Sequence, residues 1–147
     1  MTEEVREHIV VHAGSDAVMD TISDFERYPE WQAEVLEVDV LEADDQGLAT
    51  RVRFLFDARI VRVAMVLAYT YAPDAMRWRL VEGDQVRRND GAYLLRERPD
   101  GSTEVTYELA VEPTVAVPAV VRRSVARHIV DGALRGMKRR VEAGAGR

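Results

Sequence analysis

The sequence predicts an α+β fold in which one curved, seven-stranded antiparallel sheet wraps around a long C-terminal helix. Three observations support this prediction. Between residues 35 and 111, six strand-like segments are joined by short turns, which is typical of an antiparallel meander. A further strand pattern precedes them near the N-terminus, and a helical pattern follows from residue 118. A chain of 147 residues, 47% of them hydrophobic, fits one domain over residues 1–147.

The first strand is predicted at residues 3–13. The apolar residues on one of its faces are Val5, Ile9 and Val11. Arg6, His8 and His12 fall on the opposite face. Positions four apart on a strand are separated by about 13 Å, so we expect both histidines to be exposed and not to share a metal ion.

Two short helices are predicted after this strand. Ser15 is placed to cap a helix over residues 16–22. Ser23 and Glu26 have the spacing of a capping box for a second helix, over residues 24–28. A proline follows directly, so this second helix is expected to end there.

The six strands of the meander each have one more apolar face. They are predicted at residues 35–41, 49–56, 60–71, 76–81, 87–97 and 103–111. Arg53, Arg62 and Arg88 have the opposite parity to the apolar residues, which places them outside the sheet. Glu82 shares parity with Trp78, so it either points inward as an acid or base or lies in a solvated turn. The apolar side of this sheet requires a cover.

The cover is a helix predicted over residues 118–142. Its apolar residues recur at three- and four-residue steps, beginning at Val121. Gly132 and Gly136 lower helix propensity, so they either leave room for a close backbone approach, a bend or a ligand, or lie at the surface. A sheet that wraps a helix without contacting its whole length encloses a cavity, so the predicted architecture is that of a container.

Four segments carry a resemblance to a known family. They are residues 24–31 (DFERYPEW), 78–84 (WRLVEGD), 90–95 (DGAYLL) and 100–107 (DGSTEVTY). The chain resembles the START/Bet v 1-like helix-grip superfamily (SRPBCC), and within it the bacterial polyketide cyclase/dehydrase and lipid-transport branch. The likeness covers about residues 3–142. It implies the helix-grip fold and a hydrophobic small-molecule ligand.

The resemblance also implies a role for the aromatic residues of the apolar face. Such residues pack an ordinary core in most proteins, but in a helix-grip fold they line a ligand cavity, where hydroxyl and indole groups orient the ligand. The expected cavity residues are Trp31, Phe54, Phe56, Met65, Tyr69, Trp78, Tyr93, Tyr107, Ile129, Ala133 and Met137. His128 is the only histidine placed to meet a cavity, or it lies at the rim.

Several chemistries are not expected. The chain has no cysteine, which excludes disulfides and thiolate chemistry, and it has no glycine-rich phosphate loop, serine nucleophile elbow or metal-ligand cluster. No metal and no cofactor are therefore expected. The longest uncharged apolar run, residues 63–69, is too short to cross a bilayer, and the N-terminus is acidic where an export signal is basic. We expect a cytoplasmic protein, either a monomer or a homodimer.

The charge is unevenly distributed. The formal net charge is −6, yet residues 118–147 carry eight basic and two acidic residues. This block is either a solvated helix face or a surface for an acidic partner, and peripheral contact with a membrane stays open. No aromatic residues interleave with these bases, so no nucleic-acid partner is expected.

Three functions remain. The preferred one is a carrier or sensor that binds a lipid, quinone or polyketide-like molecule between the sheet and the C-terminal helix. The alternative is a polyketide aromatase/cyclase or dehydrase, which would fold a reactive chain and stabilise enolate charge with Tyr or Arg donors. Inward-facing ionisable side chains are scarce in the sequence, which favours binding. The third is an interaction module that uses Arg135, Lys138, Arg139 and Arg140.

Overall fold

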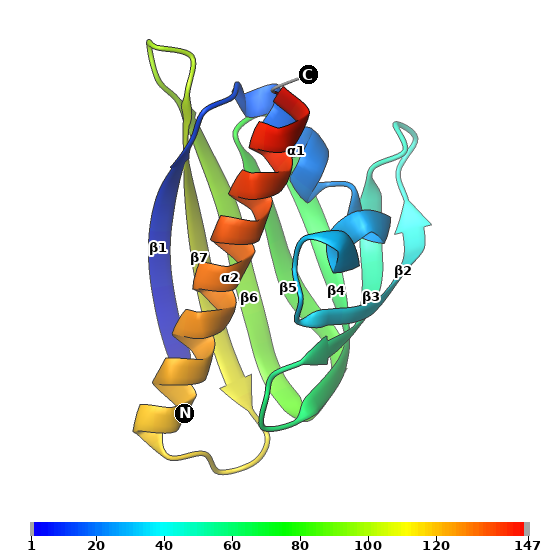
Figure 1. Cartoon of the computed structure of the whole chain (residues 1–147). Coiled ribbons are helices and arrows are strands. Elements are labelled where there is room, and N and C mark those ends of the chain that lie inside the picture. The colour runs from blue at the N-terminus through cyan, green and yellow to red at the C-terminus, as the bar shows by residue number, and fades with distance from the viewer. Residues whose placement is uncertain (1, 146–147) are drawn as a thin grey trace.

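The computed structural model describes residues 2–145 and contains seven strands, two α-helices and one 3₁₀ helix. The elements are β1 (Glu3–Val11), α1 (Ser15–Ile22), the 3₁₀ helix η1 (Phe25–Glu30), β2 (Val35–Ala43), β3 (Ala49–Asp57), β4 (Arg62–Ala72), β5 (Ala75–Asp84), β6 (Val86–Glu97), β7 (Thr103–Pro113) and α2 (Ala119–Ala145). This order confirms the predicted α+β, helix-grip architecture (Figure 1).

All seven strands form one antiparallel sheet in the order β1-β7-β6-β5-β4-β3-β2. Strands β2 to β7 are a meander, as the short turns predict. Strand β1 instead pairs with the last strand, so Val5 lies opposite Leu109 and Val11 opposite Thr103. The two edges of the sheet are therefore the strands that are first and second in the chain.

Irregular pairing bends the sheet at several places. Register shifts interrupt the ladders between β2 and β3, between β4 and β5, and between β6 and β7. Extra residues at such bulges increase local twist and bend the strand. One bulge decides the position of Glu82: Leu80 pairs with Leu67, but Glu82 pairs with Val66, so Val81 is the extra residue. Glu82 is consequently exposed on the other face, although it lies in β5 and not in a turn.

The caps predicted for the two short helices are wrong. Ser15 lies inside α1, and Gly14 occupies the cap position without a side-chain hydrogen bond. Ser23 ends α1 and donates its hydroxyl to the Met19 carbonyl at 2.7 Å, so it does not cap the following helix. That helix is a 3₁₀ helix that includes Pro29. The two helices follow each other so closely that Ser23 ends the first helix and is not available to cap the second.

Helix α2 packs mainly against β1 and α1, and to a smaller extent against β7 (Figure 1). Its buried side chains are Ala126, Val130, Ala133, Leu134, Met137 and Val141. The apolar stripe begins later than its sequence pattern predicts, because Val121 is 41% exposed and Val120 is 78% exposed. Since α2 lies toward the β1 edge, the middle strands of the sheet are not covered by it along their whole length.

Polar contacts at both ends hold α2 along β1. At its N-terminal end the Arg122 guanidinium lies 3.1 Å from the largely buried Glu3 carboxylate. At its C-terminal end Lys138 donates to the Val10 carbonyl, and Glu142 accepts both Lys138 at 2.7 Å and the His12 N–H at 2.9 Å. The helix is therefore attached at two places to β1 and the residue that follows it. Within residues 2–145, no helix is long and apolar enough to span a membrane.

The two glycines of α2 have different surroundings. A Cβ on Gly136 would lie 2.0 Å from the Trp31 carbonyl oxygen, which is backbone and cannot rotate away. A Cβ on Gly132 would meet only the Glu34 carboxylate, at 3.4 Å. Gly136 is therefore required for the close approach of α2 to the chain that follows η1, whereas Gly132 is not required for it.

We predict opposite effects for alanine at these two positions. Gly136→Ala is expected to lower the free energy of unfolding by about 2 kcal/mol or more, because the methyl group forces α2 away from Trp31. Gly132→Ala is the matched control and is expected to be neutral or to stabilise by up to about 1 kcal/mol through helix propensity. Urea denaturation of the two variants measures both values. Equal changes in the free energy of unfolding for the two variants would contradict the conclusion that the close approach of α2 requires Gly136 and not Gly132.

A second prediction concerns pH. Hydrogen bonds from the His12 N–H and the Lys138 ammonium hold the pKa of Glu142 below its usual value. A carboxyl whose pKa is lower in the folded state stabilises it above the pKa of the unfolded chain, and this contribution is lost as the pH falls through the folded pKa. Glu142→Gln should therefore lower Tm by about 3 °C at neutral pH. This difference from the wild-type protein should shrink below about pH 4.

The control for this experiment is Glu26→Gln, at an exposed glutamate of η1. It should change Tm less than Glu142→Gln does at neutral pH. A Tm difference for Glu142→Gln that stays constant from neutral to acid pH would show that the lost interaction does not depend on the charge of the carboxylate.

Candidate ligand-binding cavity

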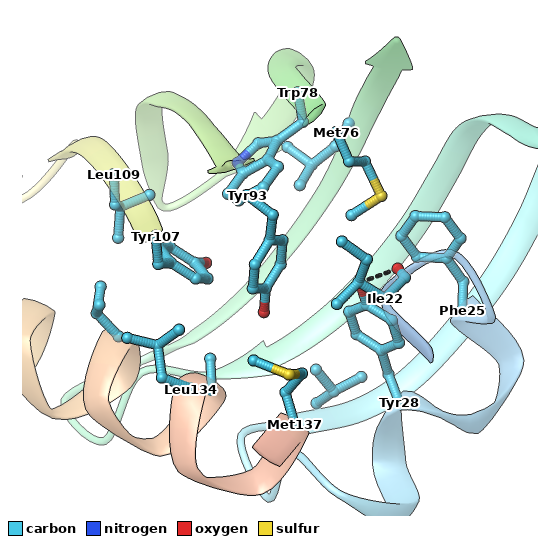
Figure 2. Packing of buried hydrophobic residues seen from close by; sticks show 14 of the residues in the cluster. Ile22, Phe25, Tyr28, Met76, Trp78, Tyr93, Tyr107, Leu109, Leu134 and Met137 are labelled. Carbon is cyan, nitrogen blue, oxygen red and sulfur yellow. Dashed lines mark hydrogen bonds between the residues drawn. The ribbon is translucent and has the colours of Figure 1, made fainter. Parts of the chain in front are cut away.

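Four aromatic side chains meet on the inner face of the sheet. Trp78 of β5 lies between Tyr69 of β4 and Tyr93 of β6, with ring centroids 5.9 and 5.8 Å away. Tyr107 of β7 packs edge-on against Trp78 at 5.3 Å and against Tyr93 at 4.8 Å. Period-2 alternation points all four toward the same side, and strand pairing brings them together. They form a continuous aromatic wall, part of which Figure 2 shows.

A second group of rings comes from η1. Phe25 and Tyr28 stack at 5.0 Å, and Phe25 contacts Tyr69 of the sheet at 4.5 Å. Trp31 packs on Tyr28 at 4.6 Å. The Tyr28 hydroxyl donates to the Ile22 carbonyl at 2.5 Å, which ties η1 to the end of α1 (Figure 2). These contacts hold η1 against the sheet, and η1 also contacts β2.

The position of Trp78 depends on Gly91 of the neighbouring strand. A Cβ on Gly91 would lie 2.2 Å from the Trp78 ring and 2.7 Å from the Glu108 carbonyl. The missing side chain leaves the space that the indole occupies. From there the indole N–H donates to Asn89 Oδ1 at 3.0 Å, and the Asn89 amide contacts the Met65 sulfur at 3.4 Å.

A partly open cavity of about 100 Å³ lies between the aromatic wall, η1 and α2. We call it the inner cavity. Eight of the eleven residues that the sequence analysis proposed line it: Phe54, Phe56, Met65, Tyr69, Trp78, Tyr93, Tyr107 and Ile129. The structure places the other three, Trp31, Ala133 and Met137, in the closely packed core around the η1–α2 contact, and they do not line this cavity.

Sequence reasoning missed ten lining residues. They are Tyr28, Gln32, Val35, Ala58, Val63, Leu67, Val86, Asn89, Leu109 and Val111. Val63, Leu67, Leu109 and Val111 share strand parity with neighbours that were proposed, so the period-2 pattern contains the signal for them. Tyr28 and Gln32 follow no such pattern, because they reach the cavity from η1 and the turn after it.

A second cavity of about 90 Å³ adjoins the first. We call it the outer cavity. The two share Ala58, Val63, Val86, Val111 and Ile129, so these residues form the boundary between them. The outer cavity continues to the β3–β4 loop and to the loop between β7 and α2, where Ile60 and Val115 are 53% and 45% exposed. Residues of both loops therefore line the outer cavity.

The charged residues near the site lie outside the inner cavity. Among the described residues that line it, none is charged. Arg122 lines the outer cavity, but its guanidinium is bound to Glu3 and to the Val117 carbonyl at 2.9 Å. Arg53, Arg62 and Arg88 are exposed, as their strand parity predicts.

His128 lies at the rim and does not line the inner cavity. Its Nε2 is 2.8 Å from the Arg59 guanidinium of the β3–β4 loop and 3.9 Å from the Glu34 carboxylate. His8 and His12 are exposed. Within the described part of the chain, no group of three or more His, Asp or Glu side chains could hold a metal ion.

The tyrosines of the cavity are neutral donors. Burial raises the pKa values of Tyr28, Tyr69, Tyr93 and Tyr107 well above their ordinary value. At neutral pH these hydroxyl groups therefore stay protonated, and that of Tyr28 already donates to the Ile22 carbonyl. They cannot serve as bases there.

The basic residues of α2 are largely neutralised by acids of the same chain. Arg135 pairs with Asp131 at 3.1 Å and Arg140 with Glu30 at 2.9 Å. Lys138 is bound to Glu142, and Arg122 to Glu3, as described above. Three of the four residues proposed for an interaction module, Arg135, Lys138 and Arg140, are therefore paired within the chain, which weakens that interpretation of the helix.

The fold and the apolar cavity define a helix-grip domain of the START/Bet v 1 type. This chain belongs to the polyketide cyclase/dehydrase and lipid transport family, whose model matches residues 2–142. No curated protein matches the chain.

Three solved structures illustrate the similarity. A START superfamily protein from Mycobacterium smegmatis has a TM-score of 0.87 at 21% identity, covering 95% of this chain and 97% of its own. A protein from Thermus thermophilus has a TM-score of 0.82 at 21% identity, covering 97% and 99%. The Zhui aromatase/cyclase from a Streptomyces species has a TM-score of 0.79 at 16% identity, covering 97% and 94%. At these identities the likeness establishes the shared fold.

The contact between Gly91 and Trp78 generates a prediction. Gly91→Ala should displace the indole, break its hydrogen bond to Asn89 and lower the free energy of unfolding by about 2 kcal/mol. The Trp78 indole N–H resonance in a ¹⁵N NMR spectrum reports the displacement. Gly144→Ala, where a Cβ meets nothing within 4 Å, is the control and should leave this resonance unchanged. An unchanged resonance in Gly91→Ala would mean that the glycine does not position the indole.

Proposed function

We propose that this protein binds a hydrophobic small molecule in the inner cavity and acts as its carrier or sensor. The observation that carries the proposal is a concave space walled by aromatic and aliphatic side chains with a few polar groups, which is the usual composition of a ligand pocket. A lipid, a quinone or a polyketide-like molecule fits this chemistry. The lining residues Phe54, Phe56, Tyr69, Trp78 and Tyr107 are proposed to contact it.

The small volume of the inner cavity restricts how a ligand can enter it. Ligand pockets are usually about 300–1,000 Å³, which is larger than the inner cavity of about 100 Å³. A ligand of that size would extend into the outer cavity and push apart the side chains at the boundary. The β3–β4 loop and the loop between β7 and α2 are the segments proposed to move, because they carry exposed apolar residues and enclose the outer cavity.

A second candidate function is that of an aromatase/cyclase, the activity named for one structural relative. Protonated tyrosines in the wall could stabilise an enolate oxygen, which is one requirement of an aldol cyclisation. The reaction also needs a proton acceptor, and none of the described lining residues of the inner cavity is a carboxylate, histidine or lysine. Binding without turnover is therefore the better-supported proposal.

Native mass spectrometry of the purified protein, followed by solvent extraction, tests the proposal directly. We expect a stoichiometric neutral cargo, or an increase in Tm with one class in a panel of quinones, lipids and polyphenols. An empty protein whose Tm ignores the whole panel would overturn the proposed function. Conversion of a bound poly-β-ketone mimic to a cyclised product would favour the second candidate.

A pair of variants locates the binding site. Ile129→Trp places a large ring at the boundary of the two cavities and should weaken binding of the extracted cargo, or of the Tm-raising panel compound, at least about tenfold. Val121→Trp, on the exposed side of the same helix, should bind as the wild-type protein does. Equal affinities for the two variants would place the ligand outside these cavities.

A further inference from the structure

Exposed aliphatic side chains gather at one end of the molecule. Seven large apolar residues of the described chain are exposed, and four of them come from the β3–β4 loop, the loop between β7 and α2, and the first turn of α2. They are Ile60, Val115, Val120 and Val121, with exposed fractions of 53%, 45%, 78% and 41%. Figure 1 shows these three segments together at its lower end. Single exposed apolar residues are common on proteins, whereas a group of them marks a contact surface.

The three segments are in contact with one another. Ile60, Val115 and Arg122 line the outer cavity together, so both loops and the start of α2 meet there. The Arg122 guanidinium also donates to the Val117 carbonyl at 2.9 Å, which ties the loop before α2 to the helix. Val120 and Val121 directly precede Arg122. The four exposed side chains therefore project from one part of the molecule.

The charge of these segments is opposite in sign to that of the whole protein. The formal net charge is −6, but residues 58–62 and 113–130 contain five arginines and no aspartate or glutamate. The arginines are Arg59, Arg62, Arg122, Arg123 and Arg127. We call these five arginines and the four exposed aliphatic residues the end surface.

Two arginines of the end surface have no acidic partner. Glu3 engages Arg122 and Arg123, at 3.1 and 3.6 Å. Arg62 and Arg127 are exposed and form no ion pair within the described part of the chain. Arg127 lies on the same side of α2 as Val120, because positions seven apart are two turns apart on a helix. Aliphatic side chains and unneutralised cations therefore occur side by side here.

This combination fits an anionic bilayer better than a protein partner. The centre of a protein interface is depleted of charge and enriched in aromatic residues and methionine. Residues 58–62 and 113–130 contain no Phe, Trp, Tyr or Met, and they hold five cations. At a bilayer, aliphatic side chains enter the boundary between headgroups and acyl chains, while basic side chains stay at the level of the phosphates.

We propose that the end surface docks this protein on a bilayer that contains anionic lipids. Ile60, Val115, Val120 and Val121 enter the headgroup boundary, and the arginines bind lipid phosphates. The inference goes beyond the proposed function and does not rest on it, because no ligand has to occupy either cavity. It also does not use the paired basic residues at the C-terminal end of α2.

Cosedimentation with lipid vesicles tests the proposal. One set of vesicles contains phosphatidylcholine alone, and the other contains equal amounts of phosphatidylcholine and anionic phosphatidylglycerol. The wild-type protein is expected to bind the mixed vesicles at least about tenfold more tightly. Raising the salt concentration from about 0.1 M to about 1 M should weaken this binding, because it shortens the Debye length from about 10 Å to about 3 Å.

The aliphatic contribution is tested by Val120→Asp. This variant should bind the mixed vesicles at least about tenfold more weakly, because a charge replaces an apolar side chain at the bilayer. It should keep its Tm, since Val120 is 78% exposed and an acid in the first turn suits the helix dipole. Leu41→Asp is the matched control, at a residue that is 51% exposed in β2 near the β2–β3 turn, and it should bind as the wild-type protein does.

The cationic contribution is tested by Arg127→Gln, which should weaken binding to the mixed vesicles about fivefold. Its control is Arg77→Gln. Arg77 is also exposed and has no ion pair within the described residues, but it lies in β5 near the β4–β5 turn, away from the end surface. This control should bind as the wild-type protein does.

Several results would overturn the proposal. Equal binding to the two kinds of vesicle would show that the arginines do not select anionic lipid. Equal losses in Val120→Asp and Leu41→Asp would place the contact elsewhere. Binding of poly-L-glutamate without binding to either kind of vesicle would identify an acidic protein as the partner. Native mass spectrometry of the cargo tests the proposed function separately, so the two proposals can fail independently.

Discussion

The attachment of α2 to β1 is the constraint on which the rest of the structure depends. Arg122 with Glu3 at one end, and Lys138 and Glu142 with the end of β1 at the other, hold the helix along this edge strand. The contact of Gly136 with the Trp31 carbonyl then sets its distance from η1. A helix held in this way cannot also fill the space over β4 and β5. The cavity is therefore a consequence of where the helix is attached.

The aromatic wall explains why this space stays partly open. Rings from neighbouring strands contact one another at 4.8 to 5.9 Å, so each is supported from the side. Gly91 gives the Trp78 indole its place, and Asn89 holds the indole N–H. Collapse of the wall into the cavity would break these contacts. The more adaptable boundary is the aliphatic one, around Ile129 and the two loops of the outer cavity.

Charge is kept on the outside by pairing along the surface. The exposed arginines of the sheet lie close to acids of neighbouring positions, as in Arg88 with Asp90 at 2.7 Å and Arg51 with Glu42 at 3.1 Å. Such exposed pairs contribute little to stability. Their effect here is that charges on the surface partly neutralise one another, while the cavity keeps only neutral hydrogen-bonding groups.

Local patterns in the sequence determined the strands, the long helix and the inward side of most strand residues, because period-2 and period-3.6 repeats act within one element. They accordingly predicted Tyr69, Trp78, Tyr93 and Tyr107 on one face. The tertiary structure alone decided the pairing of β1 with β7, the outward turn of Glu82 after the bulge at Val81, and the burial of Trp31, Ala133 and Met137 away from the cavity. It also decided that the Tyr93 hydroxyl has no hydrogen-bond partner, whereas the Tyr28 hydroxyl donates to a backbone carbonyl. Such contacts join residues far apart in the chain or depend on a single inserted residue. A local sequence repeat cannot predict either of these features.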